Sequence, residues 1–227
     1  MHDVKKVDVM EGIMDENDHI AEHVSEHMAK HGVLVVNEMG APGVGKTTTL
    51  KNIFKKLKGV KPYVIEGDIE SDLDTRDLNE IGIDTHQINT FGACHLDAPM
   101  IDHMIDHMKF DEKGILFIEN IGNLVCPAEF SIGEHVKMLI STVTEGSDKP
   151  YKYPLAFEKA DIIILNKVDL IPYLDFDEEF FMKGVRALNK SVPVFKVSGK
   201  TGEGFDEIAE WLMEKASTLE VKEHHHG

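Results

Sequence analysis

The sequence predicts an α/β protein whose central sheet is mostly parallel and is flanked by helices on both faces. Short apolar runs recur along the chain, and charged, helix-like segments separate most of them. Runs that are apolar throughout are typical of strands buried on both faces, as in parallel sheets covered by two layers of helices. A chain of 227 residues can bury a substantial core, so we expect one domain.

The candidate strands and helices follow one another along the chain. Six apolar runs are the predicted strands: 33–36, 63–65, 115–118, 137–143, 161–165 and 192–197. Four segments are the predicted helices: 9–31, 47–57, 99–108 and 204–216. The apolar stripe of the first helix consists of Ile13, Ile20, Val24 and Met28.

The predicted single domain covers residues 1–227 and has three parts. Residues 1–31 are expected to form a helical segment, residues 32–216 the core, and residues 217–227 a tail. The tail contains His224, His225 and His226, which belong either to a purification tag or to a native tail and carry no functional argument.

The charge and cysteine content exclude several classes of partner. The chain has 24 Lys and Arg against 41 Asp and Glu, and the formal net charge of −17 repels nucleic acids and anionic membranes. Two cysteines are too few for a disulfide scaffold, which fits a reducing compartment. No apolar signal region follows the first residues, and no run approaches the roughly 20 apolar residues that span a bilayer. The sequence therefore predicts a soluble, cytoplasmic protein with neither nucleic acid nor membrane as a partner.

A glycine-rich loop follows the first predicted strand. Residues 40–47 read G-A-P-G-V-G-K-T and match G-x-x-x-x-G-K-[ST], the phosphate-binding loop of P-loop NTPases. Backbone N–H groups of such a loop surround a phosphate, and the dipole of the next helix adds positive charge. We expect Lys46 to reach the β- and γ-phosphates and the Thr47 hydroxyl to bind Mg²⁺. The predicted nucleotide-binding residues here are Gly40, Gly43, Val44, Gly45, Lys46, Thr47 and Thr48.

A second motif indicates that the base is guanine. Residues 166–169 read N-K-V-D, the N-K-x-D pattern of GTP-binding proteins. The Asp169 carboxylate can accept hydrogen bonds from guanine N1–H and the 2-amino group, whereas adenine offers neither donor there. We expect Asn166 to face the Hoogsteen edge and the stem of Lys167 to cover the base plane. Ser198 and Lys200 are similar to the S-x-K segment that supports guanine from the opposite side, so GTP and GDP are the expected ligands.

Acidic residues follow two of the predicted strands. Asp68 comes after the strand at 63–65, and Glu119 comes directly after the strand at 115–118. Ligands of open α/β sheets bind at the carboxyl ends of strands, so we expect both acids to hold Mg²⁺ or its water. Asp68 is also a candidate for orienting the attacking water, and Asp72 and Asp74 are nearby rivals for that role. The predicted catalytic residues are Lys46, Asp68 and Glu119, and the predicted Mg²⁺ ligands are Thr47, Asp68 and Glu119.

The only two cysteines and a neighbouring histidine form a candidate soft-metal site. Cys94 and His95 are adjacent, and Cys126 lies seven residues after Glu119. Thiolate and imidazole ligands suit Ni²⁺, Zn²⁺ or Cu(I) better than Mg²⁺. Water or a second subunit would supply a fourth ligand. The alternative is that both cysteines are small buried hydrophobic residues.

Taken together, these motifs resemble the HypB family of nickel-incorporation GTPases. The resemblance rests on residues 40–48, 94–98, 144–146, 148–150 and 166–169, and above all on E-N-I-G-N-L-V-C-P at 119–127. It implies a P-loop NTPase of the SIMIBI type that forms a homodimer in the GTP state and helps to load Ni²⁺ into [NiFe]-hydrogenase. It also implies that Cys94, His95 and Cys126 bind Ni²⁺ or Zn²⁺ at the dimer interface, and that Lys149 reaches the nucleotide of the partner subunit. Hydrogenase maturation proteins and the hydrogenase large subunit are the implied partners.

The sequence departs from the family pattern in places. It has no cysteine-rich nickel motif or continuous histidine tract at the amino terminus, and the arginine expected nine residues after Asp68 stands one place early, at Arg76. The C-P-H triplet of the related urease nickel GTPases is absent. Histidines recur instead at four-residue spacing, either as weak chelating pairs or as a polar helix flank: His19, His23, His27, His31, and separately His103 and His107.

These features predict a GTPase metallochaperone in which the nucleotide controls dimerisation and dimerisation remodels the metal site. Phosphoryl transfer goes to water, and we expect a low intrinsic rate because no arginine or glutamine is obviously placed for catalysis. The rival functions are a urease-type nickel GTPase, a P-loop kinase of a small substrate and a non-enzymatic metal buffer.

Overall fold

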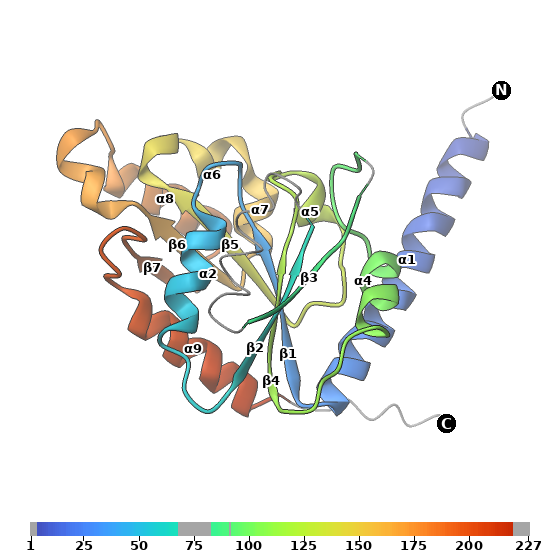
Figure 1. Cartoon of the computed structure of the whole chain (residues 1–227). Helices are drawn as coiled ribbons and strands as arrows, with labels where there is room; N and C mark the ends of the chain where they lie inside the picture. Colours follow the sequence, from blue (N-terminus) through green and yellow to red (C-terminus); the bar gives the residue numbers. More distant parts are fainter. Residues whose placement is uncertain (1–3, 68–82, 91, 220–227) are drawn as a thin grey trace.

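The computed structural model describes residues 4–67, 83–90 and 92–219, without the side chains of residues 4–13 and Asp84 (Figure 1). A seven-stranded sheet runs through the molecule in the order β3-β2-β4-β1-β5-β6-β7, and every neighbouring pair of strands is parallel. The strands are β1 (Val33–Met39), β2 (Lys61–Glu66), β3 (Asp84–Gln87), β4 (Gly114–Glu119), β5 (Val136–Thr142), β6 (Ile162–Asn166) and β7 (Val194–Lys196). The predicted α/β architecture with a parallel sheet is confirmed.

Helices cover both faces of this sheet (Figure 1). The helices α2 (Lys46–Phe54) and α9 (Phe205–Ser217) lie on one face. On the other face, α1 (Val4–Lys30) and α4 (Ala98–Ile105) cover β2, β4 and β1, and α7 (Pro154–Lys159) and α8 (Glu178–Leu188) cover β5 and β6. The shorter helices are α5 (Cys126–Glu129), α6 (Lys149–Lys152), η1 (Val143–Glu145) and η2 (Val168–Tyr173).

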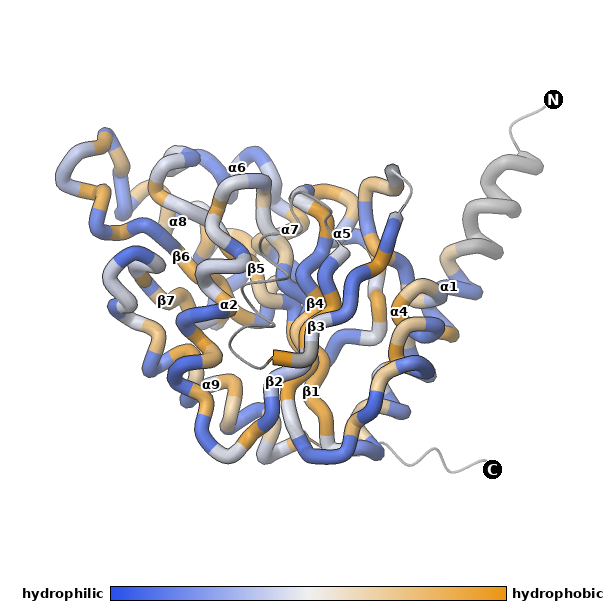
Figure 2. Tube along the Cα trace, in the orientation of Figure 1, coloured by the Kyte–Doolittle hydropathy of each residue, from blue (hydrophilic) through white to orange (hydrophobic). Residues whose placement is uncertain are grey.

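The core lies on either side of the strands, whose interior positions are buried and largely apolar (Figure 2). All seven residues of β1 are buried, and so are all six of β4. Alternate side chains along a strand point to opposite faces, so Leu34 and Val36 pack under α2 and α9 whereas Val33 and Val35 pack under α1 and α4. Burial on both faces explains why these strands are apolar throughout.

All six predicted strands are present, with ends shifted by up to three residues. The four predicted helices correspond to α1, α2, α4 and α9. The sequence analysis missed β3, whose residues D-T-H-Q form an edge strand paired only with β2. It did not identify α8 or the short helices α5, α6 and α7 either. In the part of the chain that the structure describes, no helix has the length and apolar character needed to cross a bilayer.

Candidate functional site

The phosphate-binding loop connects β1 to α2 at the carboxyl edge of the sheet. Gly43 and Gly45 have φ of 77° and 94°, the left-handed region that favours glycine. A Cβ atom at Gly45 would lie 2.7 Å from Nδ2 of Asn166, so the loop approaches the N-K-V-D segment too closely for a larger residue. Gly45 precedes α2 without a side-chain cap, which leaves the first N–H groups of the helix directed at the loop. This geometry fits a phosphate ligand.

Lys46 lies beside Glu119, as expected for neighbours in one phosphate and magnesium site. Its Nζ is 3.9 Å from Glu119 Oε1, and both side chains are at least nine-tenths buried. Thr47, the next residue, is half-buried at the same end of α2. The other predicted groups on this side, Asp68, Asp72, Asp74 and Arg76, lie outside the described residues.

Three carboxylates form a row next to Lys46, and the sequence analysis identified only one of them. Glu38 of β1 and Glu66 of β2 both pair in register with Glu119 of β4, so all three side chains lie on the face that α2 covers. Glu38 is fully buried, and neither of its carboxyl oxygens has a hydrogen-bond partner among the described residues. Burial raises the pKa of Glu38 well above its usual value, the charge of Glu119 raises it further, and Lys46 opposes the shift.

The predicted base-reading residues form a pocket. It has a volume of about 270 Å³ and lies between the start of α2 and the loops after β6 and β7. The residues that line it are Gly45, Thr48, Asn166, Lys167, Asp169, Leu170, Gly199 and Lys200. Lys167 adopts φ of 61°, a rare conformation for a residue with a side chain, and its Nζ donates to the carbonyl of Gly43 at 2.7 Å. The strained residue thus links the two loops.

Asn166 connects the phosphate-binding loop to both base-reading loops. Its Nδ2 donates to the carbonyl of Val44 at 2.8 Å, and its Oδ1 accepts from the N–H groups of Lys167 at 2.7 Å and Gly199 at 3.0 Å. These three backbone contacts engage both ends of the amide. Asn166 therefore holds the loops that line the pocket in place, in addition to its predicted role beside the base.

Ser198 positions Asp169 in the pocket. The Ser198 hydroxyl donates to Asp169 Oδ1 at 2.7 Å, while the N–H of Thr201 donates to the same hydroxyl at 3.2 Å. Ser198 is fully buried, so its hydroxyl is held by the surrounding backbone and fixes the carboxylate. The carboxylate of Asp169 remains at the pocket wall, where it can meet two donors of a base.

Lys149 lies on α6 and forms an ion pair within its own chain. Its Nζ is 2.9 Å from Glu145 Oε1, and both side chains are more than four-fifths buried. The same ammonium lies 4.9 Å from the ring centroid of Tyr153. Lys149 does not line the base pocket.

The structure brings Cys94, His95 and Cys126 together. The Sγ atoms of the two cysteines are 3.3 Å apart, and Cys94 Sγ is 3.3 Å from His95 Nδ1. Potential ligand atoms of all three residues lie within 4.8 Å of one another. The His95 ring stacks on Phe130 with centroids 4.4 Å apart. Two thiols and an imidazole in this arrangement fit three ligands of a tetrahedral Zn²⁺ or Ni²⁺ site.

The neighbouring thiol affects the ionisation of Cys126. A hydrogen bond with Cys94 raises the pKa of Cys126, and desolvation raises it further. A metal ion binds thiolates, so loading this site must release thiol protons.

One loop joins the candidate metal site to the phosphate-binding loop. Asn123 forms an antiparallel bridge with Gly40, the first residue of the phosphate-binding loop. The side chain of Asn123 donates from Nδ2 to the carbonyl of Cys94 at 3.3 Å and accepts at Oδ1 from the N–H of Val125 at 2.9 Å. A Cβ atom at Gly122 would lie 2.9 Å from Cγ of Pro42, so the two loops are also in close contact. The sequence shows that Cys126 follows Glu119 by seven residues, but not that Asn123 makes these contacts.

Asn120 anchors the segment of the first cysteine to the sheet. Its Oδ1 accepts from the N–H of Leu96 at 3.2 Å and of Ile121 at 2.9 Å, and its Nδ2 donates to Asn37 Oδ1 at 3.1 Å. The side chain is fully buried. The segment that carries Cys94 and His95 is therefore held against β4 and β1.

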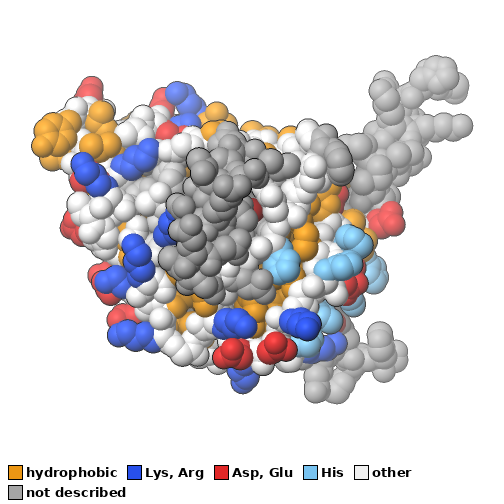
Figure 3. Space-filling view, viewed as in Figure 1, with side chains coloured by type: hydrophobic (Ala, Val, Ile, Leu, Met, Phe, Trp, Pro, Cys, Tyr) orange, Lys and Arg blue, Asp and Glu red, His pale blue; other side chains and the backbone are white. Residues whose placement is uncertain are grey.

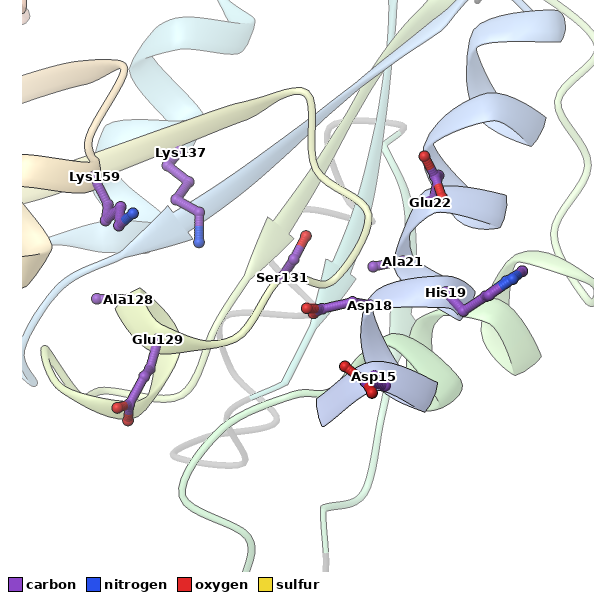
Figure 4. A pocket seen from close by; sticks show the side chains of 10 residues that line it. All are labelled: Asp15, Asp18, His19, Ala21, Glu22, Ala128, Glu129, Ser131, Lys137 and Lys159. Atoms are coloured by element: carbon purple, nitrogen blue, oxygen red, sulfur yellow. The ribbon is translucent and has the colours of Figure 1, made fainter. Parts of the chain in front are cut away.

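A larger pocket of about 650 Å³ is lined by residues of α1, α5, β5 and α7 (Figure 4). Acidic residues of α1 form one wall, with Asp18 directed into the pocket and His19 directed away from it (Figure 4). Lys137 and Lys159 lie at the opposite wall, and Lys137 pairs with Glu134 at 2.9 Å. The α1 wall is acidic, and Glu129 of α5 adds a further carboxylate to the lining beside the two lysines.

The sequence is similar to a family of nucleotide-binding proteins and to several of its members. A family model described as CobW/HypB/UreG, nucleotide-binding domain, matches residues 33–196. Hydrogenase maturation factor HypB of Escherichia coli is 43% identical over 201 residues, which are 88% of this chain and 69% of that protein. Hydrogenase/urease maturation factor HypB of Helicobacter pylori is 36% identical over 215 residues, which are 93% of this chain and 88% of that protein.

Solved structures show the same likeness. The crystal structure of HypB from Helicobacter pylori in complex with nickel has a TM-score of 0.85 at 34% identity and covers 92% of this chain and 100% of that one. The crystal structure of HypB from Archaeoglobus fulgidus has a TM-score of 0.83 at 35% identity and covers 89% of this chain and 99% of that one.

The buried Glu38 carboxyl predicts a stabilising substitution. Glu38→Leu removes a polar group without partners among the described residues, so we expect the free energy of unfolding at pH 7 to rise by about 1–3 kcal/mol. The group has a raised pKa in the folded state, so the folded protein loses stability as pH rises above the usual carboxyl pKa. The gain from Glu38→Leu should therefore be larger at pH 8 than at pH 5.

Urea unfolding at the two pH values measures this gain. Glu38→Gln is the matched control, because it keeps the shape and two buried polar atoms while removing the ionisation. A Glu38→Leu protein that is less stable than wild type at both pH values would show that the carboxyl has a stabilising partner.

Proposed function

The chain belongs to the CobW/HypB/UreG family and has the P-loop GTPase fold, and from this we propose that it is a GTP-hydrolysing metallochaperone that assists nickel insertion into [NiFe]-hydrogenase. Its relatives are named hydrogenase maturation factors, and one HypB structure contains nickel. The observation that carries the proposal is the segment 119–126. It begins with Glu119 beside Lys46, continues through Asn123 bonded to Cys94, and ends at Cys126.

Hydrolysis in this proposal depends on positioning and charge. The amide groups of the phosphate-binding loop and Lys46 bind the phosphates, while Asp169, held by Ser198, selects guanine. Mg²⁺, when bound, neutralises charge on the phosphates, and Thr47 and Glu119 are the described residues that would hold it or its waters. Asp68, Asp72 and Asp74 are the candidates for orienting the attacking water. We expect a low intrinsic rate.

The metal site would be coupled to the nucleotide through dimerisation. Cys94, His95 and Cys126 supply three ligands, and a second subunit brings further groups to complete the coordination of Ni²⁺ or Zn²⁺. Lys149 would exchange its Glu145 partner for the nucleotide of that subunit. The expected partners are hydrogenase maturation proteins and the hydrogenase large subunit, in the cytoplasm.

A second client is supported by one comparison. The relative from Helicobacter pylori is named a hydrogenase/urease maturation factor, so a urease-type role is the main rival function. A P-loop kinase of a small substrate and a non-enzymatic metal buffer are two further rival functions. A kinase would transfer the γ-phosphate to an acceptor, and a metal buffer would release no phosphate. Phosphate release from GTP in the absence of an acceptor therefore distinguishes a GTPase from both rivals.

We predict that Asp169→Asn reduces the affinity for GTP by about 30-fold or more, because the amide keeps one acceptor oxygen but sets an NH2 donor against the second guanine donor. The affinity for xanthosine triphosphate should rise, since its 2-oxo group can accept from the new amide. Binding titrations and phosphate release with GTP, ATP and xanthosine triphosphate measure both effects. Asp175→Asn is the matched control, because Asp175 is exposed and does not line the pocket. Unchanged GTP affinity in Asp169→Asn would remove this residue from the site.

We predict that GTP with Mg²⁺ shifts the protein towards a dimer and that GDP favours the monomer. Lys149→Ala should weaken the GTP-dependent dimer, because the mutant lacks the ammonium that contacts the partner's nucleotide. Light scattering across nucleotide states measures the shift, and Lys152→Ala on the exposed side of α6 is the control. A wild-type chain that stays monomeric with a non-hydrolysable GTP analogue would exclude this mechanism.

We predict that Ni²⁺ affinity differs at least about tenfold between the GDP state and the GTP-analogue state, which corresponds to about 1.4 kcal/mol of coupling. Asn123→Ala should bring this ratio towards one, because it removes the side-chain contacts with Cys94 and Val125. Cys126→Ala should abolish tight binding in both states. Because the pKa of the Cys126 thiol is raised, affinity should increase with pH across the thiol titration range.

Metal titrations in both nucleotide states test this coupling. GTP affinity is measured in parallel for Asn123→Ala. If it is unchanged, the loss of coupling is not due to a damaged nucleotide site. Equal Ni²⁺ affinity of wild type in the two states would leave the metal site in place but exclude the switch.

A further inference from the structure

An aromatic stack connects the two chain segments that carry the candidate metal ligands. The ring of Phe130 lies on the ring of His95, with centroids 4.4 Å apart and an interplanar angle of 16°. Both side chains are half-buried. A phenyl ring parallel to an imidazole at this distance fixes the plane of the imidazole, and that plane determines where both ring nitrogens point. The stack therefore sets the direction in which His95 offers its nitrogens.

The backbone of Phe130 is anchored beside Cys126. Its N–H donates to the carbonyl of Cys126 at 3.3 Å, which closes the turn at the end of α5. Its carbonyl accepts from Nζ of Lys137 on β5 at 3.4 Å. Phe130 thus belongs to the segment of Cys126 through its backbone and contacts His95 through its ring. The residue therefore sets the separation of the two ligand-bearing segments.

A buried asparagine of α1 connects the same two segments a second time. Asn17 is 6% exposed, its Nδ2 donates to the carbonyl of Ser131 at 2.9 Å, and its Oδ1 accepts from the N–H of Ala98 at 3.0 Å. Ala98 lies three residues after His95, and Ser131 comes directly after Phe130. The amide donates and accepts at once, which a carboxylate or an aliphatic side chain at this position could not do.

We propose that Phe130 and Asn17 are positioning residues of the metal site. Together they hold the two ligand-bearing segments at the separation that one ion needs, in agreement with the 4.8 Å within which ligand atoms of Cys94, His95 and Cys126 lie. Ligands held in this way lose less conformational freedom when an ion binds, so the two supports raise the affinity. The inference rests on the proposed function, because it assigns supports to the metal site which that function requires.

The stack also responds to the charge of an ion. An imidazole that donates its lone pair to a cation becomes more positive, and the face of a phenyl ring attracts positive charge. An aliphatic side chain of similar bulk would keep the burial but would lose both this attraction and the fixed plane. Leucine and tyrosine at position 130 therefore distinguish a support of His95 from plain apolar packing.

The experiment uses cobalt, which reports its own coordination. Co²⁺ bound by thiolates shows sulfur-to-metal charge-transfer bands, and the intensity of its visible d–d bands depends on the coordination number. This selectivity is needed because histidine side chains gather over α1 and α4 (Figure 3), where imidazoles can bind ions without thiolates. The full chain is titrated with Co²⁺ alone, without nucleotide and under reducing conditions, and the charge-transfer bands measure binding at the thiols.

Phe130→Leu should lower the Co²⁺ affinity at least about tenfold and change the d–d intensity, because His95 is no longer held in its plane. Phe130→Tyr keeps the ring face and should stay within about threefold of wild type. Phe110→Leu is the matched control, since Phe110 is also half-buried and its ring packs on Tyr63 with centroids 5.0 Å apart. It loses a ring of the same size and should leave the affinity and the spectrum unchanged.

Asn17→Asp keeps an acceptor for the N–H of Ala98 but lacks the donor for Ser131, so it should also lower the Co²⁺ affinity at least about tenfold. Asn189→Asp is its control, because the Asn189 amide donates to the carbonyls of Glu158 and Ala160 in a different part of the fold. Thermal unfolding confirms that each variant is folded.

Two results would overturn this inference alone. The first is wild-type affinity and a wild-type spectrum in Phe130→Leu or in Asn17→Asp. The second is an equal loss of affinity in the Phe110→Leu or Asn189→Asp control, which would reduce the effect to a general loss of stability. A wild-type chain that shows no charge-transfer bands would instead overturn the metal site of the proposed function, and this inference with it.

Discussion

The carboxyl edge of this sheet depends on asparagine side chains that pair the backbone groups of irregular loops. Loops at a buried edge carry N–H and C=O groups that strands and helices do not satisfy, and each unpaired group costs free energy. Asn166 donates a side-chain hydrogen bond to the carbonyl of Val44 in the phosphate-binding loop. Asn123, near the two thiols, forms a backbone bridge with Gly40 of the same loop. Asn120 anchors the segment of Cys94 to the sheet. The candidate nucleotide and metal sites therefore share the same supporting side chains.

The carboxylate row next to Lys46 shows a conflict between stability and function. Parallel pairing of β1, β2 and β4 places Glu38, Glu66 and Glu119 side by side. Burial and the charges of the other two carboxylates disfavour the ionisation of Glu38 and raise its pKa. Such an arrangement destabilises an isolated chain, yet a site for a magnesium nucleotide needs carboxylates at this edge. The register of the sheet thus gathers the three carboxylates, because strand pairing makes Glu38 and Glu66 neighbours of Glu119.

The sequence predicted the fold well because the strands are buried on both faces. The site residues stay predictions, and the structure brings several of them together where a fixed motif requires a fixed backbone. It missed β3 because D-T-H-Q is polar and lies at the sheet edge, where one neighbour is sufficient. It missed Glu38 because that residue lies inside a strand, and only pairing with β4 reveals its neighbours. The direction of an amide group depends on tertiary contacts, so the sequence pointed to Asn166 as a base contact but not to its bonds with Val44 and Gly199.

Coupling between the two sites requires a nucleotide that contacts the connecting segment differently in its two states. Glu119 meets this requirement at one end, because its neighbour Lys46 is the residue expected to contact the γ-phosphate. At the other end, Asn123 donates to the Cys94 carbonyl at 3.3 Å, and in the proposed mechanism this contact would pass a displacement of the segment to Cys94. Thiolate–metal distances tolerate only a few tenths of an ångström, so a small shift is enough to change affinity. Such a shift would act in both directions, and the bound metal would then alter nucleotide affinity by the same factor.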